Sequence, residues 1–192
     1  MSLKLFKQDV QRWIQPQQVA DPELVTLGTT LKLLYTYMPL RAMLWFRFGS
    51  WCKHKKIPGL PGLIQRAIYR WFGLEMSPGA DIGGGLYIAH PIGMVISVNK
   101  MGENCSIIAA VTIGLRNEHE FPHVGNNVFI GAGARILGGV KIGDDVIIGA
   151  NAVVIEDLPA GATAVGIPAK VIRIYGKKVT EKDTPVDGII PK

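Results

Sequence analysis

The sequence VGNNVFIGAGARILGGVKIGDDVIIGANAVV, residues 124–154, repeats one pattern every six positions. An aliphatic residue opens each repeat, and a small or aliphatic residue follows four positions later. The opening residues are Val124, Ile130, Ile136, Ile142, Ile148 and Val154. The residues four positions later are Val128, Ala134, Val140, Val146 and Ala152. Neither the 3.6-residue period of a helix nor the two-residue period of a strand produces this spacing.

A chain that turns a corner every six residues explains the period, with the aliphatic side chains inside and glycine at the corners. Three sides make a coil of about 18 residues, and stacked coils form parallel sheets with strands about 4.8 Å apart. The pattern continues upstream at Met76, Ile82, Ile88 and Met94 and, after one extra residue, at Met101, Ile107 and Ile113. We therefore expect a mainly β fold, a parallel β-helix of about five coils. A β-sandwich rich in glycine and valine is the alternative.

The repeat is interrupted once, because eleven residues separate Ile113 from Val124. The five extra residues should leave the coil as a loop over residues 115–121, with the sequence LRNEHEF. A loop thrown out of a regular repeat is a candidate for function. The expected organisation is an α-helical segment over 1–73, the β-helix over 74–174 and a tail over 175–192.

Charge is unevenly distributed along the chain. Residues 1–73 contain 11 Lys and Arg against 3 Asp and Glu, whereas residues 74–192 contain 10 against 12. The basic segment is also rich in aromatic residues, and its pattern predicts helices over 29–52, broken near Pro39, and over 63–72. Such a segment suits peripheral contact with an anionic membrane, and it suits a helical cap on the first coil equally well. Nucleic acid is not expected as a partner, because no recognised binding motif accompanies the charge.

The N-terminus and the cysteines indicate the compartment. No continuous apolar core marks a signal peptide near residue 1. Cys52 and Cys105 lie too far apart in sequence for a CxxC metal or redox motif, and two cysteines make no disulfide framework. We expect a cytoplasmic protein, which would meet a membrane only at its inner face.

Histidine is the side chain that most readily serves as a base near neutral pH, and the chain contains four. His54 stands in a lysine cluster, where solvation explains it. His90 stands inside the repeat, and Glu75 precedes it by fifteen residues. With 18 residues per coil, Glu75 should lie beneath residue 93, within reach of the His90 ring. A carboxylate on one ring nitrogen would leave the other free to act as a base.

Three segments carry a family resemblance: LYIAHPIGMVI at 86–96, VTIG at 111–114 and VGIPAK at 165–170. They resemble the serine acetyltransferase branch of the hexapeptide-repeat acyltransferases, over about residues 74–174. The resemblance implies a left-handed coil, a homotrimer, and acetyl-CoA bound between neighbouring subunits without a metal. It implies that His90 is the general base and Glu75 its acidic partner. The residues that would line the coenzyme groove or close over it are Gly114, Ala132, Gly133, Ala150, Pro168, Ala169 and Lys170.

Some positions depart from that branch. Serine acetyltransferases carry Asp where this chain has Ala89, and Arg-His where it has Glu120 and Phe121. Because those residues recognise the charged ends of the amino acid, L-serine is not the acceptor we expect. The nearer resemblance is to colanic-acid and capsule-type polysaccharide O-acetyltransferases. The expected function is therefore acetyl transfer from acetyl-CoA to a sugar hydroxyl in bacterial exopolysaccharide or capsule biosynthesis, on acceptors that include lipid-linked ones.

We expect direct transfer without an acetyl-enzyme, because neither cysteine has the surroundings of a nucleophile. The candidate acceptor contacts are Asn117, Glu118, His119 and His123. The first alternative is a serine O-acetyltransferase of cysteine biosynthesis. Two lower alternatives are a zinc lyase like the γ-carbonic anhydrases, using His90, His119 and His123 across subunits, and a trimeric scaffold without catalysis.

Overall fold

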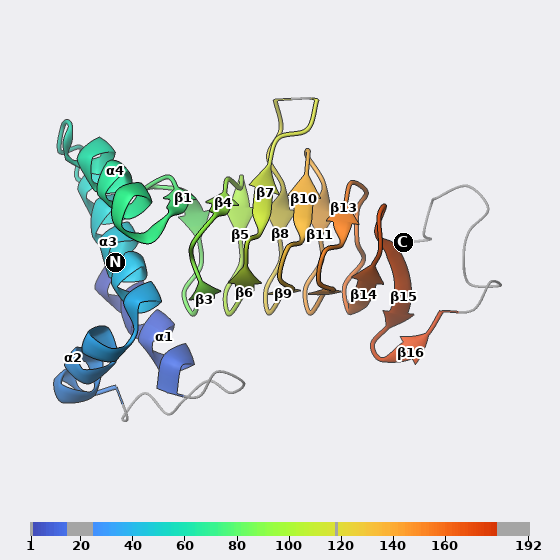
Figure 1. Ribbon diagram of the computed structural model, residues 1–192, viewed down its shortest axis with the longest axis horizontal. Helices are drawn as coiled ribbons and strands as arrows, with labels where there is room; N and C mark the ends of the chain where they lie inside the picture. Colours follow the sequence, from blue (N-terminus) through green and yellow to red (C-terminus); the bar gives the residue numbers. More distant parts are fainter. Residues whose placement is uncertain (1, 15–24, 118, 180–192) are drawn as a thin grey trace.

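The computed structural model describes residues 2–14, 25–117 and 119–179. Helices gather at one end of a long column of short strands, and β15 and β16 stand at the other end (Figure 1). The helices are α1 (Ser2–Ile14), α2 (Leu27–Thr36), α3 (Met38–His54) and α4 (Leu60–Phe72). Pro39 lies in the first turn of α3, where its missing N–H has no helical partner to lose. None of the helices in the described part of the chain is long and apolar enough to cross a bilayer.

The strands form three sheets, which are the three faces of the column. The first sheet contains β1 (Leu74–Met76), β4 (Met94–Ile96), β7 (Thr112–Gly114), β10 (Arg135–Leu137) and β13 (Val153–Val154). The second sheet contains β2 (Asp81–Ile82), β5 (Lys100–Met101), β8 (His123–Val124) and β11 (Lys141–Ile142). The third sheet contains β3 (Tyr87–His90), β6 (Ser106–Ala109), β9 (Phe129–Ile130), β12 (Ile147–Ile148), β14 (Ala162–Val165), β15 (Lys170–Ile174) and β16 (Lys177–Lys178).

Each sheet contributes one column of buried side chains to the interior. The first column is Met76, Ile96, Ile113, Ile136 and Val154. The second is Ile82, Met101, Val124 and Ile142. The third is Ile88, Ile107, Ile130, Ile148 and Ala164. This arrangement confirms the predicted mainly β fold, a parallel β-helix of about five coils that follows helices.

The register of the first coils differs from the prediction. The six-residue phase placed Met94 in one column with Met76, but Met94 pairs with Leu74 and Ile96 pairs with Met76. The first coil therefore has two residues more than 18, and the next pairing, Ile96 with Ile113, has one fewer. Leu74 and Met76 are both buried, because residues two apart in a strand point to the same side. The six-residue phase chose Met76 correctly but stacked Met94 on it, because Met94 and Ile96 are likewise both buried and only Met94 fits the phase.

Glycines that follow the inward aliphatic residues are explained by the close approach of neighbouring coils. A Cβ on Gly125 would lie 2.8 Å from the backbone of Gly143, and one on Gly131 would lie 2.6 Å from the backbone nitrogen of Ala150. Neither glycine has a positive φ. At these positions the stacked backbones therefore leave no room for a side chain, and the corners themselves are made by other residues.

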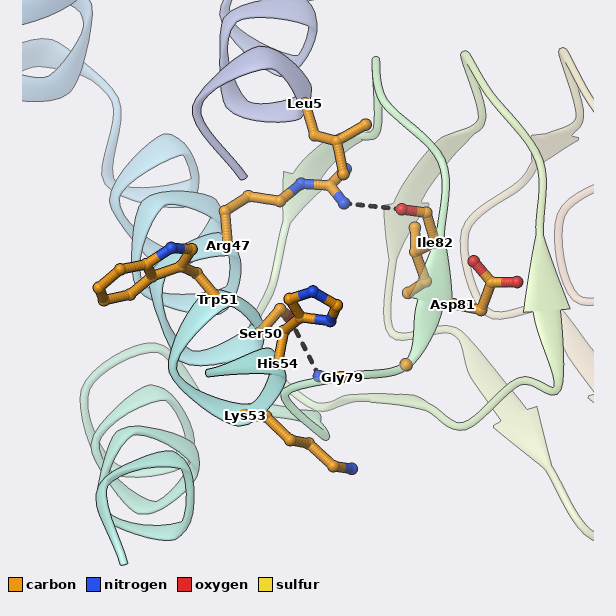
Figure 2. Close-up of a pocket in the computed structure, with 10 residues that line it drawn as sticks. Leu5, Arg47, Ser50, Trp51, Lys53, His54, Gly79, Asp81 and Ile82 are labelled. Carbon is orange, nitrogen blue, oxygen red and sulfur yellow. Dashed lines mark hydrogen bonds between the residues drawn. The ribbon is translucent and has the colours of Figure 1, made fainter. Parts of the chain in front are cut away.

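Two buried charges fasten the helices to the first coil. Arg47 of α3 donates to both carboxylate oxygens of Asp9 of α1, at 2.8 and 3.0 Å. The same guanidinium donates to the carbonyls of Ile82 and Gly83, and the Asp9 carboxylate accepts from the N–H of Leu86 at 2.9 Å. Figure 2 shows Arg47 reaching from α3 to the Ile82 carbonyl. One ion pair thus joins two helices to the strands that begin the β-helix.

Two further features orient the strands β1 and β3: the end of α4 and an aromatic contact of α1. Gly73 ends α4 in the left-handed conformation, with φ at 61°, and the chain enters β1 at the next residue. Glycine suits this position because L side chains are disfavoured there. Trp13 of α1 lies between Tyr37 and Tyr87, with ring centroids 4.7 and 4.8 Å apart. Because Tyr87 begins β3, this aromatic contact fixes the strand against α1.

Candidate active site

The predicted site residues lie along two different edges of the triangular column. We call the edge between the third and first sheets the His90 edge; it contains the turns after β3, β6, β9 and β12. We call the edge between the first and second sheets the loop edge; residues 115–117 and 119–121 leave the column there, between β7 and β8, and project from it (Figure 1). One chain therefore presents the histidine and the loop at separate places.

His90 and Glu75 share one corner of the column without a hydrogen bond between them. His90 ends β3 with an exposed ring, and Glu75 lies exposed in the middle of β1. Glu75 stacks on Val95 and not beneath residue 93, because the first coil is longer than 18 residues. The N–H of Gly93 donates to the carbonyl of Gly73 at 2.9 Å, so the turn after His90 lies over the residues before Glu75. Among the described residues, no hydrogen bond joins the two side chains.

Glu75 lines two adjoining hollows that α4 borders. One, of about 590 Å³, is lined by Tyr69, Arg70, Gly73, Glu75, Gly93, Met94 and Val95. The other, of about 490 Å³, is lined by Gly62, Gln65, Arg66, Tyr69 and Glu75. Both hollows are open, and both place an arginine of α4 in the same hollow as the Glu75 carboxylate. An anionic group held near Glu75 would therefore have a cation from α4 within the same hollow.

None of the α4 residues that line these two hollows was predicted from the sequence as a site residue. Arg70 and Tyr69 carry no motif, and the repeat that predicted the coils begins only after them. A signal did exist, because α4 ends at Phe72 and only two residues separate it from Glu75. A helix that runs directly into a strand must lie beside that strand's end.

Most of the predicted coenzyme residues lie along the His90 edge. Ala132 and Ala150 occupy equivalent turns of successive coils, and the N–H of Asn151 donates to the carbonyl of Ala132 at 2.8 Å. Pro168 and Ala169 lie in the connection from β14 to β15, and the N–H of Ala169 donates to Val153. The predicted residues found on this edge or at its C-terminal end are Ala132, Gly133, Ala150, Pro168, Ala169 and Lys170. Small side chains leave the backbone of this edge accessible to a ligand.

Gly114 is the one predicted coenzyme residue away from the His90 edge, and Lys170, at the end of that edge, has an ion-pair partner. Gly114 ends β7 on the loop edge, where its carbonyl accepts from Gly138 at 2.9 Å. Lys170 begins β15 and forms an ion pair of 3.9 Å with Glu156, both side chains being exposed. An exposed pair of this kind contributes little to stability, so Lys170 keeps its charge available to a ligand.

The loop forms a hollow of its own. It measures about 420 Å³ and is lined by Arg116, Asn117, Glu120, Leu137, Gly138, Gly139, Val140, Ile155, Glu156 and Asp157. Of the predicted acceptor contacts, Asn117 lies in this hollow, while His119 and His123 are exposed near the loop edge. Glu118 lies outside the described residues. The loop thus brings polar groups together, away from His90 of the same chain.

The three histidines of the zinc hypothesis do not meet within one chain. His119 and His123 belong to the loop edge, and His90 belongs to the other edge. The described residues contain no group of three or more His, Cys, Asp and Glu side chains arranged to hold a metal ion. His54 lines a separate hollow of about 390 Å³ between α3 and β2, with Asp81 (Figure 2). That hollow contains none of the predicted site residues.

Both cysteines are buried. Burial raises the pKa of the Cys105 thiol to about 11. Only about one thiol in a thousand would be ionised near pH 8, and the thiolate is the reactive form. Neither cysteine has the exposure of a catalytic nucleophile.

Alkylation tests this description of the cysteines. Iodoacetamide at about pH 8 is expected to leave the native chain unmodified, and to add one group to each cysteine after unfolding in guanidinium. Intact-mass spectrometry over time distinguishes the two states. Rapid modification of Cys105 in the native protein would show that its thiol is accessible and ionised.

Comparison with known proteins identifies relatives of this chain. Residues 121–156 match the family model described as "Bacterial transferase hexapeptide (six repeats)". The chain is 39% identical over 145 residues to the serine acetyltransferase of Helicobacter pylori strain J99, covering 73% of this chain and 85% of that protein. It is 36% identical over 157 residues to the serine acetyltransferase of Synechococcus elongatus, covering 80% of this chain but only 64% of that protein.

A solved structure gives the same likeness in three dimensions. A serine acetyltransferase in complex with CoA superimposes with a TM-score of 0.74 and 29% sequence identity. The match covers 89% of this chain and 69% of that one.

These relatives contradict the expectation of a sugar acceptor in polysaccharide biosynthesis, and they favour the serine alternative. The expectation rested on Ala89, Glu120 and Phe121, which lack the charges that bind an amino acid. It assumed that a carboxylate must be met from the loop. The structure shows that α4 supplies arginines beside Glu75, so three uncharged or acidic positions do not decide the acceptor.

Proposed function

Because this chain belongs to the hexapeptide-repeat acyltransferases, in the serine acetyltransferase-like branch, we propose that it transfers the acetyl group of acetyl-CoA to the hydroxyl of L-serine. The likeness to serine acetyltransferases over most of the chain carries the proposal. The CoA complex of a relative with the same fold supports acetyl-CoA as the donor. The small-residue turns of the His90 edge support that edge as the place where CoA binds.

In the proposed mechanism, His90 acts as the general base. One ring nitrogen removes the proton of the serine hydroxyl while that oxygen attacks the thioester carbonyl. The resulting oxyanion collapses to the ester and expels the CoA thiolate, which takes the proton back from the imidazolium. Glu75 would hold the other ring nitrogen and stabilise the imidazolium once the substrates bring the two side chains together.

We also propose that the enzyme is a homotrimer and that each site lies between two copies. The support is geometric: His90 and the loop lie on different edges of one triangular column. Three such columns around a parallel axis can bring the His90 edge of one copy to the loop edge of the next. Residues of the loop, such as Asn117 and His119, would then meet the His90 of a neighbour.

The acceptor is tested by measuring thiol release from acetyl-CoA together with mass spectrometry of the acylated product. L-serine should give O-acetylserine and release thiol. L-alanine, which lacks only the hydroxyl, should give release no faster than buffer. Equal release with both amino acids would show simple hydrolysis. Release with hexoses and none with L-serine would overturn the proposal.

Arg70 supplies a sharper prediction. If it faces the serine carboxylate, Arg70→Ala should raise KM for L-serine about tenfold or more, because a hydrogen bond to a charged group is lost. KM for acetyl-CoA should stay the same. Arg41→Ala, an exposed arginine of α3 outside both hollows, is the matched control. An unchanged KM for L-serine in Arg70→Ala would remove α4 from acceptor recognition.

A further inference from the structure

The outer side of α3 carries a stripe of exposed apolar side chains. Leu44, Phe48 and Trp51 are 37, 42 and 37% exposed, and half-buried Trp45 lies among them. Their spacing of three and four residues places them on one face of the helix. The opposite face of α3 is already buried against the core. A helix with apolar residues on both sides normally has both sides covered.

Aromatic contacts join this stripe to α4. The ring of Trp71, 56% exposed, lies 5.8 Å from the ring of Trp45. Trp45 lies 6.4 Å from Phe48, and Phe48 stacks on Trp51 at 5.9 Å. We call Leu44, Trp45, Phe48, Trp51 and Trp71 the aromatic patch. Figure 2 shows the indole of Trp51 extending from α3, and Trp51 also borders the hollow between α3 and β2.

The surroundings of the aromatic patch are strongly basic. Residues 24–74 contain eight Lys and Arg and no Asp or Glu. Arg47 is neutralised by Asp9, but exposed Arg41 and Lys55 extend the stripe at its two ends, followed by exposed Lys56. Arg41 donates to backbone carbonyls of α2, which leaves its charge without a counter-ion in that contact. The patch is thus an apolar surface among mostly basic side chains, with Asp81 as the one acidic residue in the hollow that Trp51 borders.

This combination selects the kind of partner. A second copy of the chain would bring two basic surfaces together, which is unfavourable. An anionic bilayer offers negative headgroups for the cations, and an interfacial layer in which tryptophan is especially stable. We propose that the aromatic patch docks the protein on the surface of a membrane that contains anionic lipid. The contact is peripheral, and it goes beyond the proposed acetyl transfer without depending on it.

Vesicle co-sedimentation tests the docking. The full-length protein should bind vesicles of phosphatidylcholine with about 30% phosphatidylglycerol, and should bind pure phosphatidylcholine at least tenfold more weakly. Binding should fall as salt rises above about 0.15 M, because the cations are exposed. Quenching by brominated lipid should reach the exposed tryptophans at the same lipid concentrations.

Matched variants distinguish membrane binding through the aromatic patch from nonspecific binding by other exposed aromatic or basic side chains. Phe48→Ala with Trp71→Ala should weaken binding about tenfold, whereas Tyr175→Ala, an exposed aromatic near the other end, should not. Lys55→Glu with Lys56→Glu should weaken binding at least tenfold, whereas Lys177→Glu with Lys178→Glu on β16 should not.

Three outcomes would overturn the proposal. The first is no binding of the wild type to the anionic vesicles at low salt. The second is equal binding by patch and control variants. The third is a change in oligomer size, measured by light scattering, as the only effect of the patch variants; the patch would then be an interface between copies. Serine-dependent acetyl transfer, measured without lipid, reports separately on the proposed function.

Discussion

His90→Ala is expected to lower kcat for acetyl transfer to L-serine by about two to four orders of magnitude, the usual contribution of a general base. KM for acetyl-CoA should change little, because in the proposed mechanism the ring acts on the acceptor hydroxyl. The histidine is exposed at the end of β3, so its removal should leave the thermal unfolding temperature unchanged. Steady-state thiol release and a thermal melt measure the two effects.

Two further variants, Glu75→Gln and His54→Ala, are comparisons for the fall in kcat expected of His90→Ala. Glu75→Gln keeps the shape of the side chain but removes the charge that would stabilise the imidazolium, so kcat should fall by a smaller factor. His54→Ala, which alters an exposed histidine outside the candidate site, should have no effect. If His90→Ala kept more than about a tenth of the activity, the base would have to be another residue.

Asp9→Ala is expected to have the largest effect on stability, about 3–5 kcal/mol, because it leaves the buried charge of Arg47 without its partner. Thermal unfolding should then occur about 10 °C lower. The stability lost in Asp9→Ala should come from the unpaired charge of Arg47. Asp9→Leu combined with Arg47→Met removes both charges, and should restore most of the stability.

The exposed pair of Lys170 and Glu156 is the matched control for this measurement. Glu156→Ala removes the same kind of interaction at the surface, and should change stability by less than about 1 kcal/mol. If Asp9→Ala were as mild as Glu156→Ala, the ion pair would not be what fastens the helices to the first coil.

The coils could be predicted from sequence because each turn of the backbone requires an inward aliphatic residue at a fixed interval. The register of the first coil could not, because Met94 and Ile96 are both buried and only Met94 fitted the six-residue phase. The contact of Asp9 with Arg47 was also out of reach, since no local pattern joins residues 38 positions apart.

Some residues of the candidate site could be predicted from the sequence and others could not, for similar reasons. His90 and the small residues of the His90 edge lie within motifs, so sequence alone could propose them. Tyr69 and Arg70 lie outside any motif, and only the packing of α4 beside β1 brings them to Glu75. The acceptor was predicted wrongly because missing charges in the loop say nothing about charges that another element supplies.

The ion pair of Asp9 and Arg47 also bears on how the column ends. A stack of parallel strands has an unpaired edge at each end. The free backbone N–H and C=O groups of such an edge could pair with another molecule, and repeated pairing would build a fibre. At the first coil, Arg47 occupies the carbonyls of Ile82 and Gly83, and Asp9 occupies the N–H of Leu86. At the last coil, β15 and β16 turn back antiparallel on β14. Backbone groups at both ends of the column are thus already paired, which disfavours end-on stacking of one molecule on another.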